Sequence, residues 1–159
     1  MVIKVFRKEK SFRTDKTAEQ ISNSISWITE SFHKESNKKQ LFEGRVSKEV
    51  FEILPVFDYG PRKQLRPLIE GEIIDKGTFR IVDVKFGLRQ EMKLLLVIGL
   101  IFNLVMTVIL GATPFLAKFP LKDIWWVIPI IAVVTILGLH KYWNVKVQRS
   151  INILRRCIK

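Results

Sequence analysis

The residues best suited to bind a ligand lie in one short basic stretch, YGPRKQLRP at 59–67. Arg62, Lys63 and Arg66 follow Tyr59 closely, and guanidinium groups beside an aromatic ring can hold a phosphate and stack against a base. The pattern predicts a site for a phosphate-bearing ligand such as a nucleotide. A second interpretation stays open, in which a basic turn near a bilayer attracts lipid headgroups or is simply solvated. Three cations on neighbouring strands would extend the surface: Arg45, Arg80 and Lys85.

No combination of residues typical of a catalytic centre occurs in the sequence. The two histidines, His33 and His140, lie far apart, and GxSxG, HExxH and Walker-type sequences are absent. The single cysteine, Cys157, provides neither a disulfide framework nor a metal quartet. Glu70 and Glu72 share one face of a strand, which is better interpreted as a solvated face than as a cation site. We therefore expect no catalytic residues, no metal and no cofactor.

Hydrophobicity and positive charge are both high in this chain. Of its 159 residues 48% are hydrophobic, and the formal net charge is +12. A soluble protein this basic usually binds nucleic acid, but its apolar residues would then be spread at helix or strand periods rather than concentrated in one stretch. The combination indicates a membrane protein whose partner is the lipid bilayer, and not DNA or RNA.

Two uncharged segments are long enough to cross a membrane. The 24 residues between Lys93 and Lys118 carry no formal charge, and a spanning helix needs about 20 such residues. We predict spans at about 94–111 and 124–143, joined by a short Pro-containing turn. The two spans would form a transmembrane hairpin.

The basic residues predict the orientation of this hairpin. Residues 141–159 carry six Lys+Arg and no acid, whereas the connecting turn carries only Lys118 and Lys122. Because positive charge is retained on the cytoplasmic side, both termini should be cytoplasmic. The expected location is the bacterial inner membrane, with a multi-pass topology.

Two polar residues lie within the first span. Asn103 and Thr107 are four residues apart and therefore share one helix face. In hydrocarbon such groups bond between helices, so they either hold the hairpin together or mediate self-association or a pore.

The segment before the hairpin begins with an amphipathic helix predicted over 17–35. Thr17 and Gln20 fit a capping box at its start. Its apolar residues recur at spacings of four, three and four: Ile21, Ile25, Ile28 and Phe32.

Short β-rich segments follow this helix and predict an antiparallel β-meander of 4–5 strands. Gly44 and Gly71 inside strands indicate a bulge or a close backbone approach, and Pro55 indicates a strand edge or a bend. The predicted strands are 41–46, 49–57, 67–74 and 78–86, with 2–6 as an additional edge strand.

The C-terminal segment predicts a second amphipathic helix. Trp143, Val147, Ile151, Leu154 and Ile158 form its apolar stripe, which we expect to dock on the sheet rather than lie among anionic lipids. The expected fold is a membrane α+β protein. Its parts are a cytoplasmic domain at 1–92, a transmembrane hairpin at 93–143 and a basic amphipathic cytoplasmic helix at 144–159.

The order of these parts resembles a loose group of small bacterial two-transmembrane proteins, most of which have no assigned function. The resemblance rests on three short segments, FEG (42–44), EVFEI (49–53) and RPLIEGEI (66–73). A weaker similarity is to two-span membrane effectors of anti-phage systems, in which a cytoplasmic β-domain senses a cyclic nucleotide. Those effectors commonly place the spans before the β-domain, whereas this chain has them after it, so no site residue is carried over.

Taken together, these patterns favour a regulated membrane effector. Its cytoplasmic domain would bind a ligand, such as a cyclic nucleotide, or a partner through the 59–67 turn and thereby control how hairpins associate. Two spans cannot enclose a pore alone, so this function requires a homo-oligomer. The alternative is a non-enzymatic accessory or scaffold subunit of a membrane complex.

Overall fold

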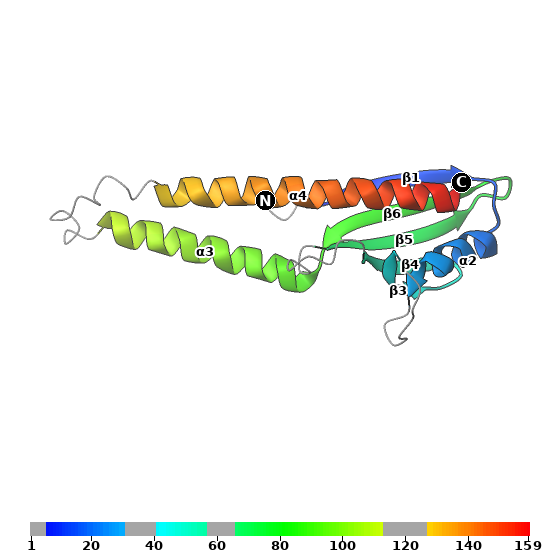
Figure 1. Cartoon of the computed structure of the whole chain (residues 1–159), viewed down its shortest axis with the longest axis horizontal. Coiled ribbons are helices and arrows are strands. Elements are labelled where there is room, and N and C mark those ends of the chain that lie inside the picture. The colour runs from blue at the N-terminus through cyan, green and yellow to red at the C-terminus, as the bar shows by residue number, and fades with distance from the viewer. Residues whose placement is uncertain (1–5, 31–40, 57–65, 113–126) are drawn as a thin grey trace. The chain divides into compact units, whose positions relative to one another are not determined.

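The chain forms two compact units in a computed structural model (Figure 1), which describes residues 6–30, 41–56, 66–112 and 127–159. Unit 1 combines Met1–Arg89 with Trp143–Lys159, and unit 2 consists of Gln90–Tyr142. The sequence of unit 2 is therefore inserted into that of unit 1. The C-terminal helix, which the sequence places after the hairpin as a separate segment, belongs to the same unit as the sheet.

Unit 1 is built on a six-stranded sheet in the order β1-β6-β5-β4-β3-β2. All neighbouring strands are antiparallel except β2 and β3, which are parallel over two residues. The predicted antiparallel meander is confirmed as β3 to β6. The strands are β1 (Lys8–Thr14), β2 (Thr29–Glu30), β3 (Phe42–Val46), β4 (Val50–Pro55), β5 (Pro67–Asp75) and β6 (Arg80–Leu88).

The edge strand next to β6 is β1. Of the additional strand predicted at 2–6, only Phe6 is described, and it lies in a turn. The seven residues of β1 run from Lys8 opposite Phe86 to Thr14 opposite Arg80. The sequence KEKSFRT has too many charges to be predicted as a strand, but an edge position tolerates them because one side faces solvent. Residues 1–5 lie outside the described part of the chain.

Helix α2 (Ala18–Ile28) begins at the predicted capping box. The backbone N–H of Gln20 donates to Thr17 Oγ1 at 3.2 Å, and the N–H of Thr17 donates to Gln20 Oε1 at 2.9 Å. Ile21 and Ile25 are fully buried, as their spacing predicts.

The same helix ends earlier than predicted. Thr29 is extended and begins β2, so the predicted helix over 17–35 is wrong for residues 29 and 30. Thr29 Oγ1 donates to Ile25 O at 2.7 Å, which satisfies a carbonyl in the last turn and allows the chain to leave the helix. Phe32 lies outside the described residues.

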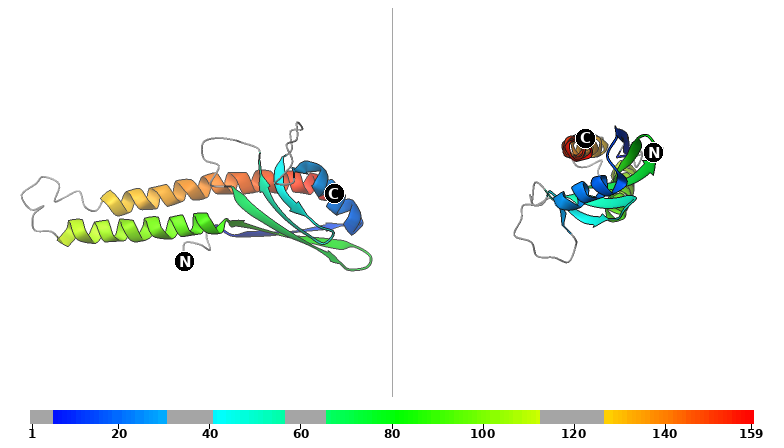
Figure 2. Two further views of the ribbon diagram at one scale, coloured as in Figure 1. Left: turned by 90° about the horizontal axis from the view of Figure 1, so that it is seen from below. Right: turned by 90° about the vertical axis from the view of Figure 1, so that its right-hand side faces the viewer.

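The core of unit 1 lies between one face of the sheet and two helices. Alternate residues along the strands point to this face, and Figure 2 shows α2 and the C-terminal end of helix α4 (Val127–Ile158) beside the strands. Buried strand side chains include Phe42, Ile53, Ile69, Val82, Val84 and Phe86.

The end of α4 completes this core. Trp143, Val147, Leu154 and Ile158 are at most 1% exposed, so docking of the C-terminal stripe on the sheet is confirmed. The ring of Phe6 packs edge-on against Trp143, with centroids 5.7 Å apart. Burying large side chains at this spacing holds the helix in one orientation on the sheet.

Both strand glycines mark close approaches. A Cβ on Gly44 would clash with the backbone of Glu52 and Ile53, and a Cβ on Gly71 would clash with the ring of Phe51. The interpretation as close approach is therefore confirmed at both positions. Pro55 lies beyond Ile53, the last residue of β4 that pairs with β5, so its missing N–H interrupts no ladder between these two strands.

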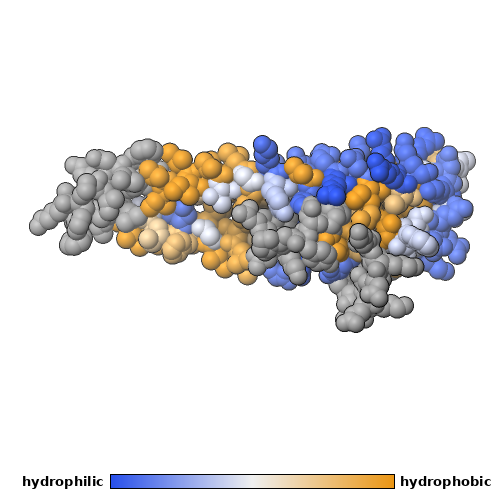
Figure 3. Space-filling view, in the orientation of Figure 1, coloured by the Kyte–Doolittle hydropathy of each residue, from blue (hydrophilic) through white to orange (hydrophobic). Residues whose placement is uncertain are grey.

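Among the described residues, two helices are long and apolar enough to cross a membrane, judged by length and composition. The first lies within unit 2, and the second runs from unit 2 into unit 1. Helix α3 (Gln90–Ala112) includes the predicted span 94–111, and α4 includes residues 127–143 of the other, while 124–126 are not described. Figure 3 shows hydrophobic side chains over α3 and the first part of α4. Exposed apolar residues there include Leu94, Ile98, Phe102, Val108, Ile131 and Leu137.

Candidate functional site

A groove in unit 1 combines the edge strand β1 with the last turns of α4. Its volume is about 490 Å³. Phe12 and Ile151, both buried, form its apolar part, and Ser11, Gln148 and Asn152 add polar groups. Five cations complete the lining: Lys8, Lys10, Arg13, Arg155 and Lys159. We call this feature the basic groove.

Local periodicity explains how the two walls are built. Residues 148, 151, 152, 155 and 159 of the groove recur at helical spacing and so form one stripe of α4. On β1, Lys8, Lys10 and Phe12 share one strand face, while Ser11 and Arg13 share the other. Both faces of β1 contribute, so the groove follows the edge of the strand.

The electrostatics of the basic groove favour an anionic ligand. No Asp or Glu is among its lining residues, and none of its five cations has an ion-pair partner within the described ranges. The Arg13 guanidinium makes a cation–π contact with Phe79, with its central carbon 3.9 Å from the centroid of the ring. Lysine and arginine side chains arranged in this way bind phosphate or carboxylate groups by charge-assisted hydrogen bonds.

A pair of hydrogen bonds ties the two walls together at one end. Thr14 Oγ1 donates to Ile158 O at 2.7 Å, and Lys16 Nζ donates to Cys157 O at 3.0 Å. The last carbonyls of a helix lack partners within it, so these donors cap α4 and fix its end to the end of β1. The groove is thus preorganised by contacts about 140 residues apart in sequence.

Most of the ligand site predicted at 59–67 lies outside the described residues, including Tyr59, Arg62 and Lys63. Arg66 is described: its Nη1 lies 3.3 Å from Glu43 Oε2, and the arginine side chain is only 17% exposed. Glu43 thus engages the one member of the predicted site that the structure describes.

The cations expected to extend that surface lie at two separate places. Arg80 binds Asp75 across the β5–β6 turn, with its Nη2 2.9 Å from Asp75 Oδ2. The N–H of Gly77 and the Arg80 guanidinium hold the pKa of Asp75 below its ordinary value. Arg45 and Lys85 instead line a pocket on the outer face of the sheet.

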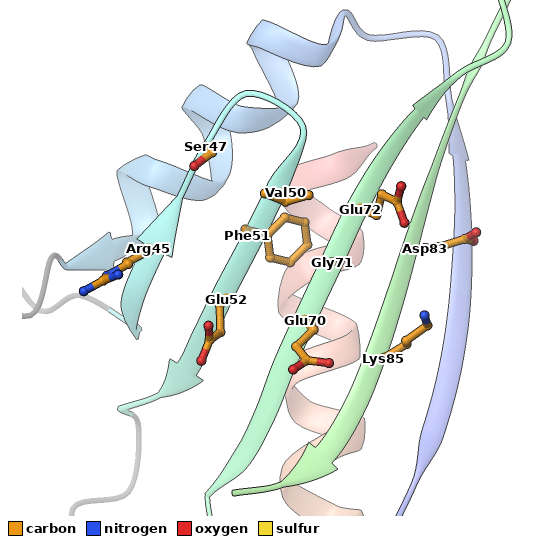
Figure 4. A pocket seen from close by; sticks show the side chains of 10 residues that line it. All are labelled: Arg45, Ser47, Val50, Phe51, Glu52, Glu70, Gly71, Glu72, Asp83 and Lys85. Carbon is orange, nitrogen blue, oxygen red and sulfur yellow. The ribbon is translucent and has the colours of Figure 1, made fainter.

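That outer pocket is acidic, as Figure 4 shows. Glu52, Glu70, Glu72 and Asp83 project from β4, β5 and β6 around a space of about 460 Å³. Glu52 lies directly opposite Glu70, and Glu72 directly opposite Asp83. Such like-charged neighbours reduce the stability of a sheet. Among the described residues, no group of three or more His, Cys, Asp or Glu could hold a metal ion.

The polar residues of the first span bond within the hairpin. Asn103 Nδ2 donates to Ile128 O in α4 at 3.3 Å, and Thr107 Oγ1 donates to Asn103 O at 2.8 Å. Of the two predicted roles, the structure provides the contacts for holding α3 against α4. Self-association through these residues stays a prediction.

The lone cysteine lies on α4 beside the capped helix end. Burial raises the pKa of the Cys157 thiol, an effect that the charge of Lys16 partly opposes. A thiol with a raised pKa is a poor nucleophile at neutral pH.

The basic groove was not predicted from the sequence. Its cations come from two charged runs at opposite ends of the chain, RKEKSFR (7–13) and RRCIK (155–159). Each run by itself is ordinary surface charge. Only the helical stripe at 148, 151, 155 and 159, compared with an edge strand at 8–14, could have indicated that they meet.

Comparison with known proteins identifies no relative of this chain. No protein-family model matches the chain, and neither a curated protein nor a solved structure matches it.

Proposed function

We propose that this protein is a regulated effector of a bacterial inner membrane. The α+β unit binds an anionic ligand in the basic groove, and its occupancy controls the association of hairpins and thereby membrane integrity, as in anti-phage defence. The observation that carries the proposal is a groove lined by five basic side chains and by no Asp or Glu. The cyclic nucleotide expected from the sequence is one example of such an anionic ligand.

The membrane part of the proposal rests on composition and charge. Two apolar helices are long enough to span a bilayer, and the six cations after the second one favour cytoplasmic termini. The groove and the second apolar segment share helix α4, so a ligand that binds residues 148–159 acts on the helix that leads into the membrane. Because two spans enclose no pore, the active form is a homo-oligomer.

Induced expression in a bacterial host with a membrane-potential dye tests this function. The wild type should depolarise the membrane, and the groove variant Lys10→Glu/Arg155→Glu should not. The control Lys48→Glu/Lys76→Glu changes the net charge equally at exposed positions outside the groove and should depolarise like the wild type. Abundant membrane-inserted protein without depolarisation would count against an effector, and equal depolarisation by both variants would count against the groove.

A reporter enzyme fused after Lys159 tests the topology separately. Activity characteristic of the cytoplasm is expected, and periplasmic activity would overturn the orientation.

A second candidate function is an accessory or scaffold subunit of a membrane complex. The observation that favours it is the edge strand β1, whose only neighbour in the described sheet is β6. A scaffold would co-purify with a stoichiometric membrane partner and leave the membrane potential unchanged.

A further inference from the structure

The outer edge of β1 is a row of backbone hydrogen-bonding groups. β1 is the first strand of the sheet order, and all seven of its residues pair with β6 on the other side. In an antiparallel pair, every second residue directs its N–H and C=O away from the partner. Three or four residues of β1 therefore present both a donor and an acceptor at this edge.

The basic groove lies along this edge. Three consecutive residues of β1, Ser11, Phe12 and Arg13, line it, although consecutive side chains point to opposite faces of the sheet. A groove that contacts both faces of a strand contains the strand's edge between them. Helix α4 forms the opposite wall through its stripe at 148–159.

These two features together select among anionic ligands. A phosphate accepts hydrogen bonds only, so it would suit the cations but would meet the carbonyl oxygens of β1 unfavourably. A peptide backbone offers N–H and C=O groups in alternation and matches an open strand edge. Acidic side chains on that peptide would meet the five cations of the groove.

We infer that the basic groove binds an extended acidic segment of a partner protein, which adds to the sheet as a further strand beside β1. This inference rests on the proposed function, because it names the ligand class of the same groove. A segment of about seven residues spans roughly 23 Å at 3.3 Å per residue, the length of β1. The partner then regulates the effector by occupying the groove next to α4.

A competing explanation is that Lys8 and Lys10 only protect an edge strand from aggregation. It accounts for cations on the strand, but not for Arg155 and Lys159 on the facing stripe of α4. Protection of an edge also does not require apolar side chains, whereas Phe12 and Ile151 line the groove.

The test uses the full-length protein in detergent and a fluorescein-labelled octapeptide of alternating Glu and Thr, followed by fluorescence anisotropy. A second peptide has the same sequence with N-methyl groups on its four central amides, so it keeps every charge but loses two backbone donors on each edge of its strand. Losing two or more backbone hydrogen bonds should weaken binding at least about tenfold. Lys10→Glu/Arg155→Glu should weaken binding of the unmodified peptide, and Lys48→Glu/Lys76→Glu should not.

Hydrogen exchange supplies a readout that simple charge attraction would not change. The unmodified peptide should slow exchange of backbone amides within Lys8–Thr14. Equal affinity of the two peptides, or unchanged exchange in β1, would overturn strand addition.

Binding of a cyclic dinucleotide, cyclic di-AMP, distinguishes a failure of the strand-addition inference from a failure of the proposed function. If cyclic di-AMP binds through Lys10 and Arg155 while the peptide does not, strand addition is wrong and the groove remains an anion site. If neither probe binds to the wild type, the assignment of the groove as the regulatory site is wrong as well.

Discussion

The hydrogen bond between Thr14 and the end of α4 is the contact whose removal tests the fold of unit 1 most directly. Thr14 is 7% exposed, and its Oγ1 donates to Ile158 O at 2.7 Å. The substitution Thr14→Val keeps the branched shape of the side chain but removes this donor, and with it the longer bond of 3.4 Å that Thr14 Oγ1 accepts from the Lys16 N–H. It leaves a helix-terminal carbonyl without its partner in a buried place.

The expected cost follows from that geometry. A buried polar group left without a partner costs about 1–3 kcal/mol. The remaining bond from Lys16 to Cys157 O serves a different carbonyl and cannot replace the lost one. For a domain of this size the loss corresponds to a melting temperature lower by roughly 5–15 °C.

Urea unfolding in a mild detergent measures the effect. The unfolding is monitored by near-UV circular dichroism, a signal to which the buried Trp143 contributes. The control is Thr78→Val, an exposed residue in the β5–β6 turn, which should change the free energy of unfolding by less than about 0.5 kcal/mol. If Thr14→Val costs no more than the control, the bond does not anchor α4 to β1. The idea that capping preorganises the groove would then be wrong.

Three further predictions concern charges of unit 1. Glu72→Lys should raise the free energy of unfolding by about 0.2–1 kcal/mol, because it replaces repulsion from Asp83 by attraction, and a lower urea midpoint would contradict this. Asp75 has a lowered pKa in the folded state, so its stabilisation exists above about pH 4 and disappears as the pH falls through the folded value. Urea midpoints of the wild type should therefore fall more steeply in acid than those of Asp75→Asn, and parallel curves would exclude a contribution. Alkylation of Cys157 by iodoacetamide should be slower than that of a free thiol at pH 8, because burial raises its pKa, and an equal rate would show that the thiol is accessible.

Local patterns predicted most elements of unit 1 because their signals are contained within a few residues. The capping box at Thr17 and Gln20 and the apolar spacing of α2 indicated where that helix begins. The alternation in β3 to β6 indicated the meander. Such patterns depend on which residues a single element buries, and a sequence shows this directly.

Predictions failed where a neighbouring element determines the outcome. The charges of β1 oppose a strand, yet pairing with β6 over seven residues makes it one. Similarly, the end of α2 is set by Thr29, which pairs with β3 instead of extending the helix. In both cases a tertiary hydrogen-bond ladder outweighs the weak local preference.

The sequence alone determined that the chain has two apolar segments of membrane-spanning length, a β-rich part before them and a basic amphipathic helix after them, since these properties depend on composition and periodicity. For the last helix, the tertiary structure decided between the two positions that the sequence allows, on the sheet or among lipids, and placed it in the core of the first unit. It also decided that Lys8 and Lys10 meet Arg155 and Lys159 in one groove. The reason is physical, because like charges 145 residues apart do not attract each other. The packing of Trp143, Val147 and Leu154 on the sheet brings them together.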